Sequence, residues 1–277
     1  MNGSKWNAYK NAGWAIGIIV CLLALCVGFF ISIFIRYRGE MERSGVHLGP
    51  VKVEETITIE AEPAEVPDGS LRQLSEGSDA GQGYIDSLTF LCDSALIGLR
   101  DYGVLSGGYA TTQVWGSSAG NIPASGLAEC IIKYPGDGSE IRAADAAMIA
   151  KPSRLVISLG SDGLHGMEQE AFIQGYETLI RDIRNASPST TIIVCSLSSI
   201  APGYAGADDL TSTDIRMANE WIRQICMDTG VYFADLADTL NDGAETLVAD
   251  YASANGKALN SAGLNKALEY LRTHTTT

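Results

Sequence analysis

The sequence predicts an α/β protein, in which a mostly parallel β-sheet lies between two layers of helices and one N-terminal transmembrane helix precedes it. In the second half of this 277-residue chain, short apolar runs alternate with stretches of helical periodicity. Such alternation is typical of βαβ units. A long uncharged run near the N-terminus has the length of a membrane span. The length of the chain suits one sizeable domain with appendages.

The first 36 residues contain the predicted anchor. Between Lys10 and Arg36 lie 25 uncharged residues, and about 20 apolar residues suffice to cross a bilayer core. This run is too long for the apolar core of a signal peptide. We predict a short cytoplasmic tail over residues 1–10 and a single membrane-spanning anchor over residues 11–36. Basic residues flank both ends, but the short tail favours a cell-membrane protein whose domain is extracytoplasmic.

Residues 37–83 have the composition of a stalk. Acidic residues crowd this segment, which also contains Pro63 and Pro67 and ends in a Gly/Ser-rich stretch from Gly69 to Gly83. Such a composition does not bury enough apolar surface to fold alone. The sequence therefore predicts an acidic stalk over residues 37–83 and a folded domain over residues 84–277.

The domain contains strands and helices in alternation. Apolar and β-branched runs predict the strands, and 3.6-residue periodicity predicts the helices, with Pro152, Pro188 and Gly230 as stop signals. The predicted strands span residues 88–91, 112–115, 154–159, 191–196 and 231–234. The predicted helices span residues 95–102, 139–150, 168–186, 214–229 and 261–274. Ligands of such folds bind beyond the carboxyl ends of the strands.

Charge and cysteine content exclude several classes of function. With 33 acidic and 19 basic residues the net charge is −14, which disfavours nucleic acid as a partner because phosphate binding needs clustered Lys and Arg. The four cysteines outside the anchor are scattered without a C-x-x-C pair, so no metal site is predicted. The chain also lacks G-x-G-x-x-G after its first strand and a Walker A lysine motif, which disfavours a nucleotide-binding domain.

The most informative stretch is Asn-Gly-Lys-Ala-Leu-Asn-Ser-Ala-Gly at residues 255–263. It resembles the last block of the SGNH (GDSL-type) hydrolases, Asp-Gly-x-His-Leu-Asn-x-x-Gly. In that family the aspartate and histidine activate a distant serine. Asn255 stands at the aspartate position here and Ala258 at the histidine position.

Phe90-Leu-Cys-Asp-Ser-Ala95 resembles the family's opening block, in which Gly-Asp-Ser carries the nucleophile. Ser94 matches the nucleophile and Asp93 its preceding aspartate, while Cys92 replaces the glycine. A serine at a helix N-terminus suits a nucleophile, because free N–H groups favour a developing oxyanion. The alternative interpretation is that Ser94 only caps the helix.

Leu159-Gly-Ser-Asp-Gly-Leu164 resembles the family's Gly-x-Asn-Asp block, with Gly160 as its glycine. Asp162 occupies the position of the asparagine whose side chain donates to the oxyanion. An ionised carboxylate only accepts hydrogen bonds, so Asp162 would repel an oxyanion. Alternatively, Asp162 is a turn residue. The family's second block is marked only by Gly116 or Gly120, with Asn121 nearby.

His165 is the only histidine that follows one of these strand-end loops, since His47 lies in the predicted stalk and His274 near the C-terminus. Two interpretations stand for it: a surface or ligand-contacting residue, or a relocated base for Ser94. Without an adjacent base, a serine hydroxyl is a poor nucleophile at neutral pH.

The resemblance covers most of residues 86–274 and implies a three-layer α/β/α sandwich, flavodoxin-like in architecture, that acts on esters without a metal or cofactor. The departures from the family's pattern favour a catalytically impaired protein that binds a cell-envelope carbohydrate or acyl ester. The alternative is a working serine esterase or deacetylase that uses Ser94 and His165. A structural module that meets another envelope protein is the third hypothesis. The predicted binding residues are Asp93, Gly116, Asn121, Gly160, Asp162, Asn255 and Ala258.

Overall fold

A six-stranded parallel sheet forms the centre of the domain. The computed structural model describes residues 69–276 except residues 205 and 207, so the predicted tail, the predicted anchor and stalk residues 37–68 lie outside the described part. The sheet has the strand order β1-β8-β7-β6-β2-β3, and all neighbouring strands run parallel. Its strands are β1 (Arg72–Gln73), β2 (Leu88–Cys92), β3 (Val114–Trp115), β6 (Arg154–Ser158), β7 (Thr191–Cys195) and β8 (Tyr232–Ala234).

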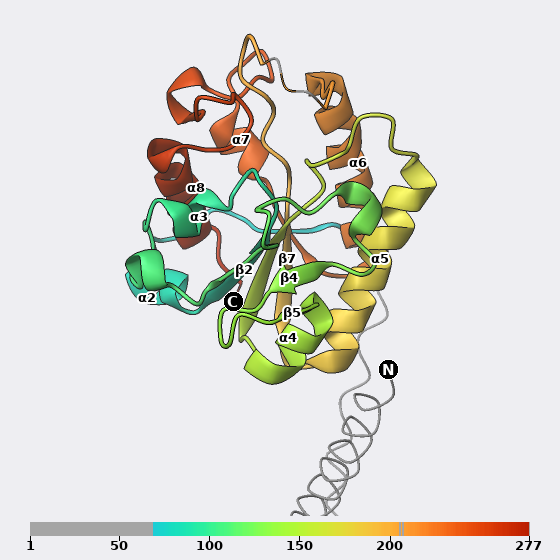
Figure 1. The fold of residues 1–277 in the computed structure, drawn as a ribbon. Helices are drawn as coiled ribbons and strands as arrows, with labels where there is room; N and C mark the ends of the chain where they lie inside the picture. The colour runs from blue at the N-terminus through green and yellow to red at the C-terminus, as the bar shows by residue number, and fades with distance from the viewer. Residues whose placement is uncertain (1–68, 205, 207, 277) are drawn as a thin grey trace, which may run out of the picture. The chain divides into compact units, whose positions relative to one another are not determined.

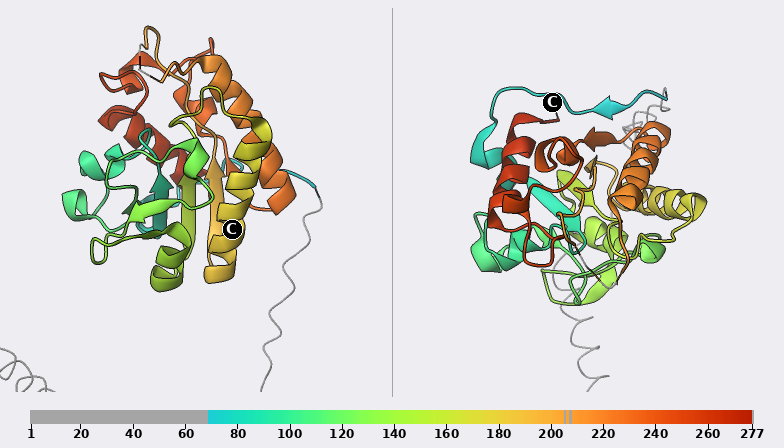
Figure 2. Two further views of the ribbon diagram at one scale, coloured as in Figure 1. Left: turned by 45° about the vertical axis from the view of Figure 1, so that its right-hand side comes forward. Right: turned by 90° about the horizontal axis from the view of Figure 1, so that it is seen from above.

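Helices cover both faces of this sheet (Figures 1 and 2). One face carries α4 (Ala143–Ala150), α5 (Gln169–Ala186) and α6 (Ser212–Thr229), and the other α2 (Gly81–Asp86), α3 (Gly98–Asp101), α7 (Leu236–Leu240) and α8 (Ser261–Thr273). A hairpin of β4 (Ile131–Lys133) and β5 (Glu140–Arg142) precedes α4. Three 3₁₀ turns, η1 (Gly108–Ala110), η2 (Ala124–Gly126) and η3 (Ala249–Tyr251), lie in the loops.

Alternating side chains of each strand divide the core into two layers. On β6, Leu155 and Ile157 pack under α5, whereas Val156 packs on the opposite face under α8 and α3. The two-residue period of a strand produces this division, and burial on both faces explains the continuous apolar runs. The predicted α/β fold with a mostly parallel sheet is confirmed. None of the helices in the described part is long and apolar enough to cross a membrane.

The structure differs from the sequence prediction around residue 139. Ser139 does not begin a helix: its N–H and its hydroxyl both donate to Asp137, at 2.9 and 2.6 Å, in a turn. Residues 140–142 then form β5, paired antiparallel with β4, and α4 begins only at Ala143. Pairing with a neighbouring strand overrides the local helical tendency of these residues.

Residues 69–83, which composition assigned to the stalk, belong to the folded domain in the structure. β1 pairs with β8, and the N–H of Gly77 donates to the carbonyl of Thr273 at 2.7 Å. Leu74, just after β1, is buried. A strand of two exposed residues has no apolar run, which is why its composition resembles that of a linker.

Candidate functional site

Ser94 and Asp162 lie at the carboxyl ends of the neighbouring strands β2 and β6. From β2 the chain continues through α3 on one face of the sheet, and from β6 through α5 on the other. Such a reversal is a topological switch point, where ligands of open α/β sheets bind. The fold therefore brings these two predicted site residues together.

Asp93 links the carboxyl ends of β2 and β6 through hydrogen bonds. Its side chain is fully buried, and one oxygen accepts the N–H groups of Gly160 and Ser161 at 3.0 and 2.8 Å and the Ser161 hydroxyl at 2.9 Å. Its other oxygen accepts the N–H of Ala95 at 3.1 Å. Asp93 thus acts as a structural acceptor that fixes the loop carrying Asp162.

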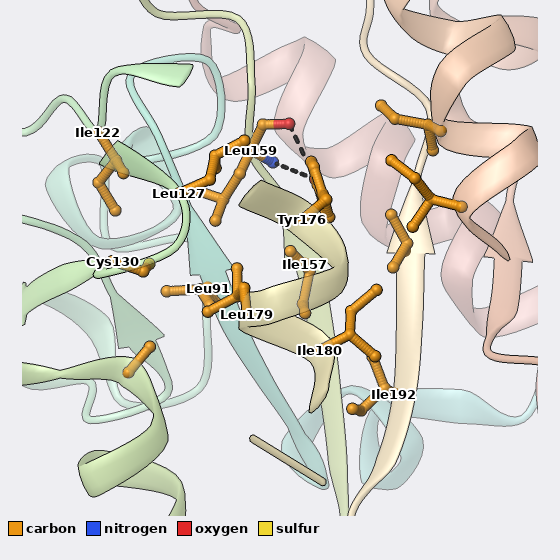
Figure 3. Packing of buried hydrophobic residues seen from close by; sticks show 14 of the residues in the cluster. Leu91, Ile122, Leu127, Cys130, Ile157, Leu159, Tyr176, Leu179, Ile180 and Ile192 are labelled. Atoms are coloured by element: carbon orange, nitrogen blue, oxygen red, sulfur yellow. Dashed lines mark hydrogen bonds between the residues drawn. The ribbon is translucent and has the colours of Figure 1, made fainter. Parts of the chain in front are cut away.

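The core fixes this loop from the other side (Figure 3). The hydroxyl of Tyr176 donates to the carbonyl of Leu159 at 2.9 Å and accepts its N–H at 3.3 Å. Gly160 follows with φ +112°, and a Cβ on it would lie 2.8 Å from the ring of Phe172. Only glycine fits there, so the predicted site residue Gly160 acts through backbone conformation.

The carboxylate of Asp162 accepts four hydrogen bonds. One oxygen accepts the Ser94 hydroxyl at 2.5 Å and the Lys257 ammonium at 2.8 Å. The other accepts the backbone N–H groups of Ser94 and Ile122, both at 3.1 Å. Four donors match the acceptor capacity of an ionised carboxylate. Asp162 is only 6% exposed and binds the side chain and the N–H of Ser94 together, so neither the helix-cap nor the simple-turn interpretation describes these two residues.

Lys257 extends this cluster towards the loop after β7. Its ammonium also donates to Asp208 at 3.1 Å, and the hydroxyl of Tyr204 donates to the other oxygen of Asp208 at 2.5 Å. Burial lowers the pKa of Lys257, but the bonds to Asp162 and Asp208 and the charge of Asp93 outweigh it, so the pKa is raised. Lys257 therefore stays protonated at neutral pH and does not accept a proton there.

The cluster carries more negative than positive charge. Burial, and then the charge of Asp162, raise the pKa of Asp93 to about 6 despite its four donors. Three acidic side chains, those of Asp93, Asp162 and Asp208, lie around the single ammonium of Lys257. Such a site opposes further negative charge.

Asn255 and Ala258 stand in a tight loop. The side-chain oxygen of Asn255 accepts the N–H groups of Lys257 and Ala258, both at 2.9 Å, and the hydroxyl of Ser253 at 2.8 Å. Asn260 caps α8 by accepting the N–H groups of residues 262 and 263. These bonds keep the loop in place, and the methyl group of Ala258 offers no group for proton transfer.

The hydrogen bond of the His165 ring goes to Asp214 and not to Ser94. Its Nδ1 lies 3.1 Å from a carboxylate oxygen of Asp214, which forms the capping box of α6 with Thr211, and half of its side chain is exposed. The hydrogen bonds of the described residues therefore favour the surface interpretation of His165 over the relocated base.

Among the described residues, neither Gly116 nor Asn121 has a hydrogen bond to Ser94 or Asp162. Gly116 follows β3, and a Cβ on it would lie 2.3 Å from the end of the Ile97 side chain. Asn121 is exposed, and its carbonyl accepts the Ser117 hydroxyl at 2.5 Å. Its neighbour Ile122, which the sequence did not single out, supplies the N–H that reaches Asp162.

An open cleft of about 740 Å³ lies over this cluster. Its lining mixes polar and apolar groups. The side chains of Ser94, Tyr204, Asp208 and Lys257 lie among small or compact residues, namely Ala201, Pro202, Gly203, Gly206, Ala249, Ala252, Ser253, Ala254, Asn255 and Gly256. Within the described residues, no group of three His, Cys, Asp or Glu side chains is arranged to hold a metal ion.

Sequence reasoning missed Lys257, Asp208 and Tyr204. Lys257 offered a signal, because it is the one cation in the last block and stands directly before the position of the missing histidine. Asp208 and Tyr204 offered none, since the loop after β7 has no motif.

A family model places the chain in a known group. Residues 101–262, more than half of the chain, match the GDSL-like lipase/acylhydrolase family. The chain belongs to this family. The matched segment includes Asp162 and Lys257 and begins after Ser94. The predicted family is therefore confirmed, and the domain is an esterase-like hydrolase scaffold.

Solved structures resemble this GDSL-family chain at low sequence identity. A Streptococcus pneumoniae protein named for platelet activating factor is 17% identical, with 67% of this chain and 82% of that chain covered and a TM-score of 0.49. A GDSL-like lipase from Parabacteroides merdae is 15% identical, with 73% and 98% covered and a TM-score of 0.49. A G-D-S-L lipolytic protein from Desulfitobacterium hafniense is 16% identical, with 66% and 95% covered and a TM-score of 0.47. No curated protein matches the chain in sequence.

Proposed function

We propose that this protein is a membrane-anchored, extracytoplasmic member of the GDSL family that binds a cell-envelope carbohydrate or acyl ester without turnover. The uncharged run before Arg36 supports the anchor. The contacts of Asp162 support the loss of turnover. The shape and lining of the cleft support binding.

The carrying observation is that the carboxylate of Asp162 accepts the backbone N–H of Ser94, a donor that a developing oxyanion would need. In an acyl hydrolase, the N–H of the nucleophilic serine and further donors stabilise the oxyanion of the tetrahedral intermediate. Here the N–H groups of Ser94 and Ile122 donate to Asp162 at 3.1 Å. A bound ester would have to displace a buried carboxylate that holds four hydrogen bonds.

The hydroxyl of Ser94 also lacks the family's histidine base. Its proton points at Asp162, the neighbouring Lys257 is protonated, and residue 258 is an alanine. The losses of an oxyanion donor and of a base occur in the same site. Removing one oxyanion donor alone lowers kcat by about 10²–10³, so we expect no turnover above the background rate.

The cleft suits a polyhydroxylated ligand. Two carboxylate–ammonium pairs, a tyrosine hydroxyl and the exposed Asn255 amide offer both donors and acceptors, and few bulky apolar side chains line the space. Hydroxyl groups of a sugar pair with such mixed donors and acceptors.

The test is calorimetric binding of a partly O-acetylated xylo-oligosaccharide to the full-length chain in detergent, with released acetate measured in the same samples. We expect the same Kd for wild type and Ser94→Ala and no acetate from either. Tyr204→Ala should weaken binding, whereas Tyr109→Ala, an exposed tyrosine outside the cleft, should not. Acetate release that disappears in Ser94→Ala would overturn the proposal, and so would the absence of binding to both the acetylated and the deacetylated oligosaccharide.

A further inference from the structure

Lys257 is linked to Ser94 through a single oxygen atom. The Ser94 hydroxyl and the Lys257 ammonium both donate to Oδ1 of Asp162, at 2.5 and 2.8 Å. Lys257 is 8% exposed and lines the cleft together with Ser94. An amine therefore stands beside the serine, in the loop where the family's histidine is missing.

Four groups that titrate or carry charge face this amine, from three loops. Asp93 follows β2, Asp162 follows β6, and Tyr204 and Asp208 belong to the loop after β7. Burial favours the neutral amine, but the hydrogen bond and charge of Asp162 are the strongest of the opposing influences on its pKa. Asp162 thus holds the serine and keeps the amine protonated.

We infer that Asp162 silences a serine–lysine acyl-transfer centre in which Lys257 is the proton acceptor of Ser94. This inference rests on the proposed function, in which Asp162 occupies the oxyanion position beside Ser94. It adds Lys257 as the base that would complete a catalytic centre. Serine–lysine pairs carry out acyl transfer on several unrelated folds. An asparagine at position 162 would reverse both effects of the aspartate, because its amide donates to an oxyanion and carries no charge.

The reaction would then proceed in two steps. The neutral amine of Lys257 takes the proton of the Ser94 hydroxyl, whose oxygen bonds to the acyl carbon of an ester. The ester C–O bond breaks, and the alcohol leaves with the proton from Lys257. Water then attacks the acyl-serine, its proton passes through Lys257 to Ser94, and a carboxylic acid is released.

The experiment measures p-nitrophenyl acetate hydrolysis by the full-length chain in detergent, from pH 7 to 10. We expect Asp162→Asn to raise the Ser94-dependent rate about 100-fold, in line with the effect of a single oxyanion donor. The rate should increase with pH as Lys257 loses its proton. In the Asp162→Asn background, Lys257→Met and Ser94→Ala should each return the rate to that of wild type, whereas His165→Ala should leave it unchanged.

Two outcomes would overturn the inference. One is an Asp162→Asn protein that is folded and no faster than wild type. The other is a gain that survives Lys257→Met. If Asp162→Asn does not fold, Asp162→Ala replaces it, since this change also frees the two backbone N–H groups, and its smaller gain must show the same dependence on Lys257.

The unmodified chain tests the proposed function separately. Rapid Ser94-dependent turnover by the unmodified chain would contradict the absence of turnover, whichever result the Asp162 variants give. Conversely, if neither wild type nor Asp162→Asn hydrolyses the ester, the binding proposal stands and only the role of Lys257 is contradicted.

Discussion

At the scale of single residues, the site depends on which hydrogen-bond donors the carboxylate of Asp162 accepts. An asparagine in the place of Asp162 would offer an amide donor to a ligand, whereas the carboxylate takes up two backbone N–H groups, a hydroxyl and an ammonium. The motifs predicted that residues 94, 162, 255 and 258 belong to the site. They also predicted that a carboxylate at position 162 would repel an oxyanion. The position of Lys257 was not predicted, because its partners come from loops that lie 95 and 49 residues away.

Loss of Lys257 should destabilise the fold. Lys257→Met leaves the carboxylates of Asp162 and Asp208 without their cation, next to the buried Asp93. Removing one partner of a buried ion pair costs about 3–5 kcal/mol. Since Asp208 is partly exposed, we expect the free energy of unfolding to fall by about 3 kcal/mol. Urea unfolding monitored by circular dichroism measures the change.

Lys266→Met, which removes a surface pair with Glu269, is the matched control and should cost less than about 1 kcal/mol. Equal losses in both variants would contradict this role of Lys257.

At the scale of elements, the long helices and central strands were predictable and the short segments were not. The predicted helix 168–186 matches α5 closely, and the predicted strand 191–196 matches β7, because their apolar patterns are long and match one period. β1 and α2 were missed, since segments of two and six residues are too short to show a period. β5 was predicted as helix because its pairing with β4 is a tertiary contact that local propensity does not contain.

The N-terminus of α6 offers a test at this scale. Thr211 accepts the N–H of Asp214 and Asp214 accepts the N–H of Thr211, and the same aspartate contacts His165. We expect Thr211→Ala to lower the free energy of unfolding by about 1 kcal/mol, as for other helix caps, and Thr211→Ser to retain most of it. Thermal unfolding of the two variants beside wild type measures this. A Thr211→Ser protein as unstable as Thr211→Ala would show that the hydroxyl cap is not the cause.

At the scale of the whole molecule, the parallel sheet determines where the site lies. Its strand order places the carboxyl ends of β2 and β6 side by side at the switch point, and the two buried layers fix the strands below them. Fold class and family could be predicted from the alternation of elements and from three weak motifs in order. The cleft and the charge cluster could not, because they arise from loops that meet only in the folded chain.

The buried Asp93 should make the stability of the domain depend on pH. Burial raises its pKa from 3.8 to about 6, so folding favours its protonated form. Its stabilising contribution is complete below pH 3.8 and is lost as the pH rises through about 6. We expect the free energy of unfolding, measured in urea at pH 5 and 7.5, to include a decrease with pH that is absent in Asp93→Asn. The same pH dependence in both proteins would contradict a raised pKa for Asp93.

The most direct test of the occupied oxyanion position is labelling of Ser94. The full-length wild-type chain in detergent is treated at pH 7 with a serine-directed fluorophosphonate, and the labelled peptide is quantified by mass spectrometry beside Ser94→Ala. Because Asp162 holds both the hydroxyl and the N–H of Ser94, we expect no more labelling of wild type than of Ser94→Ala. Stoichiometric modification of Ser94 in a well-folded wild-type protein would show an activated serine and contradict the occupied site.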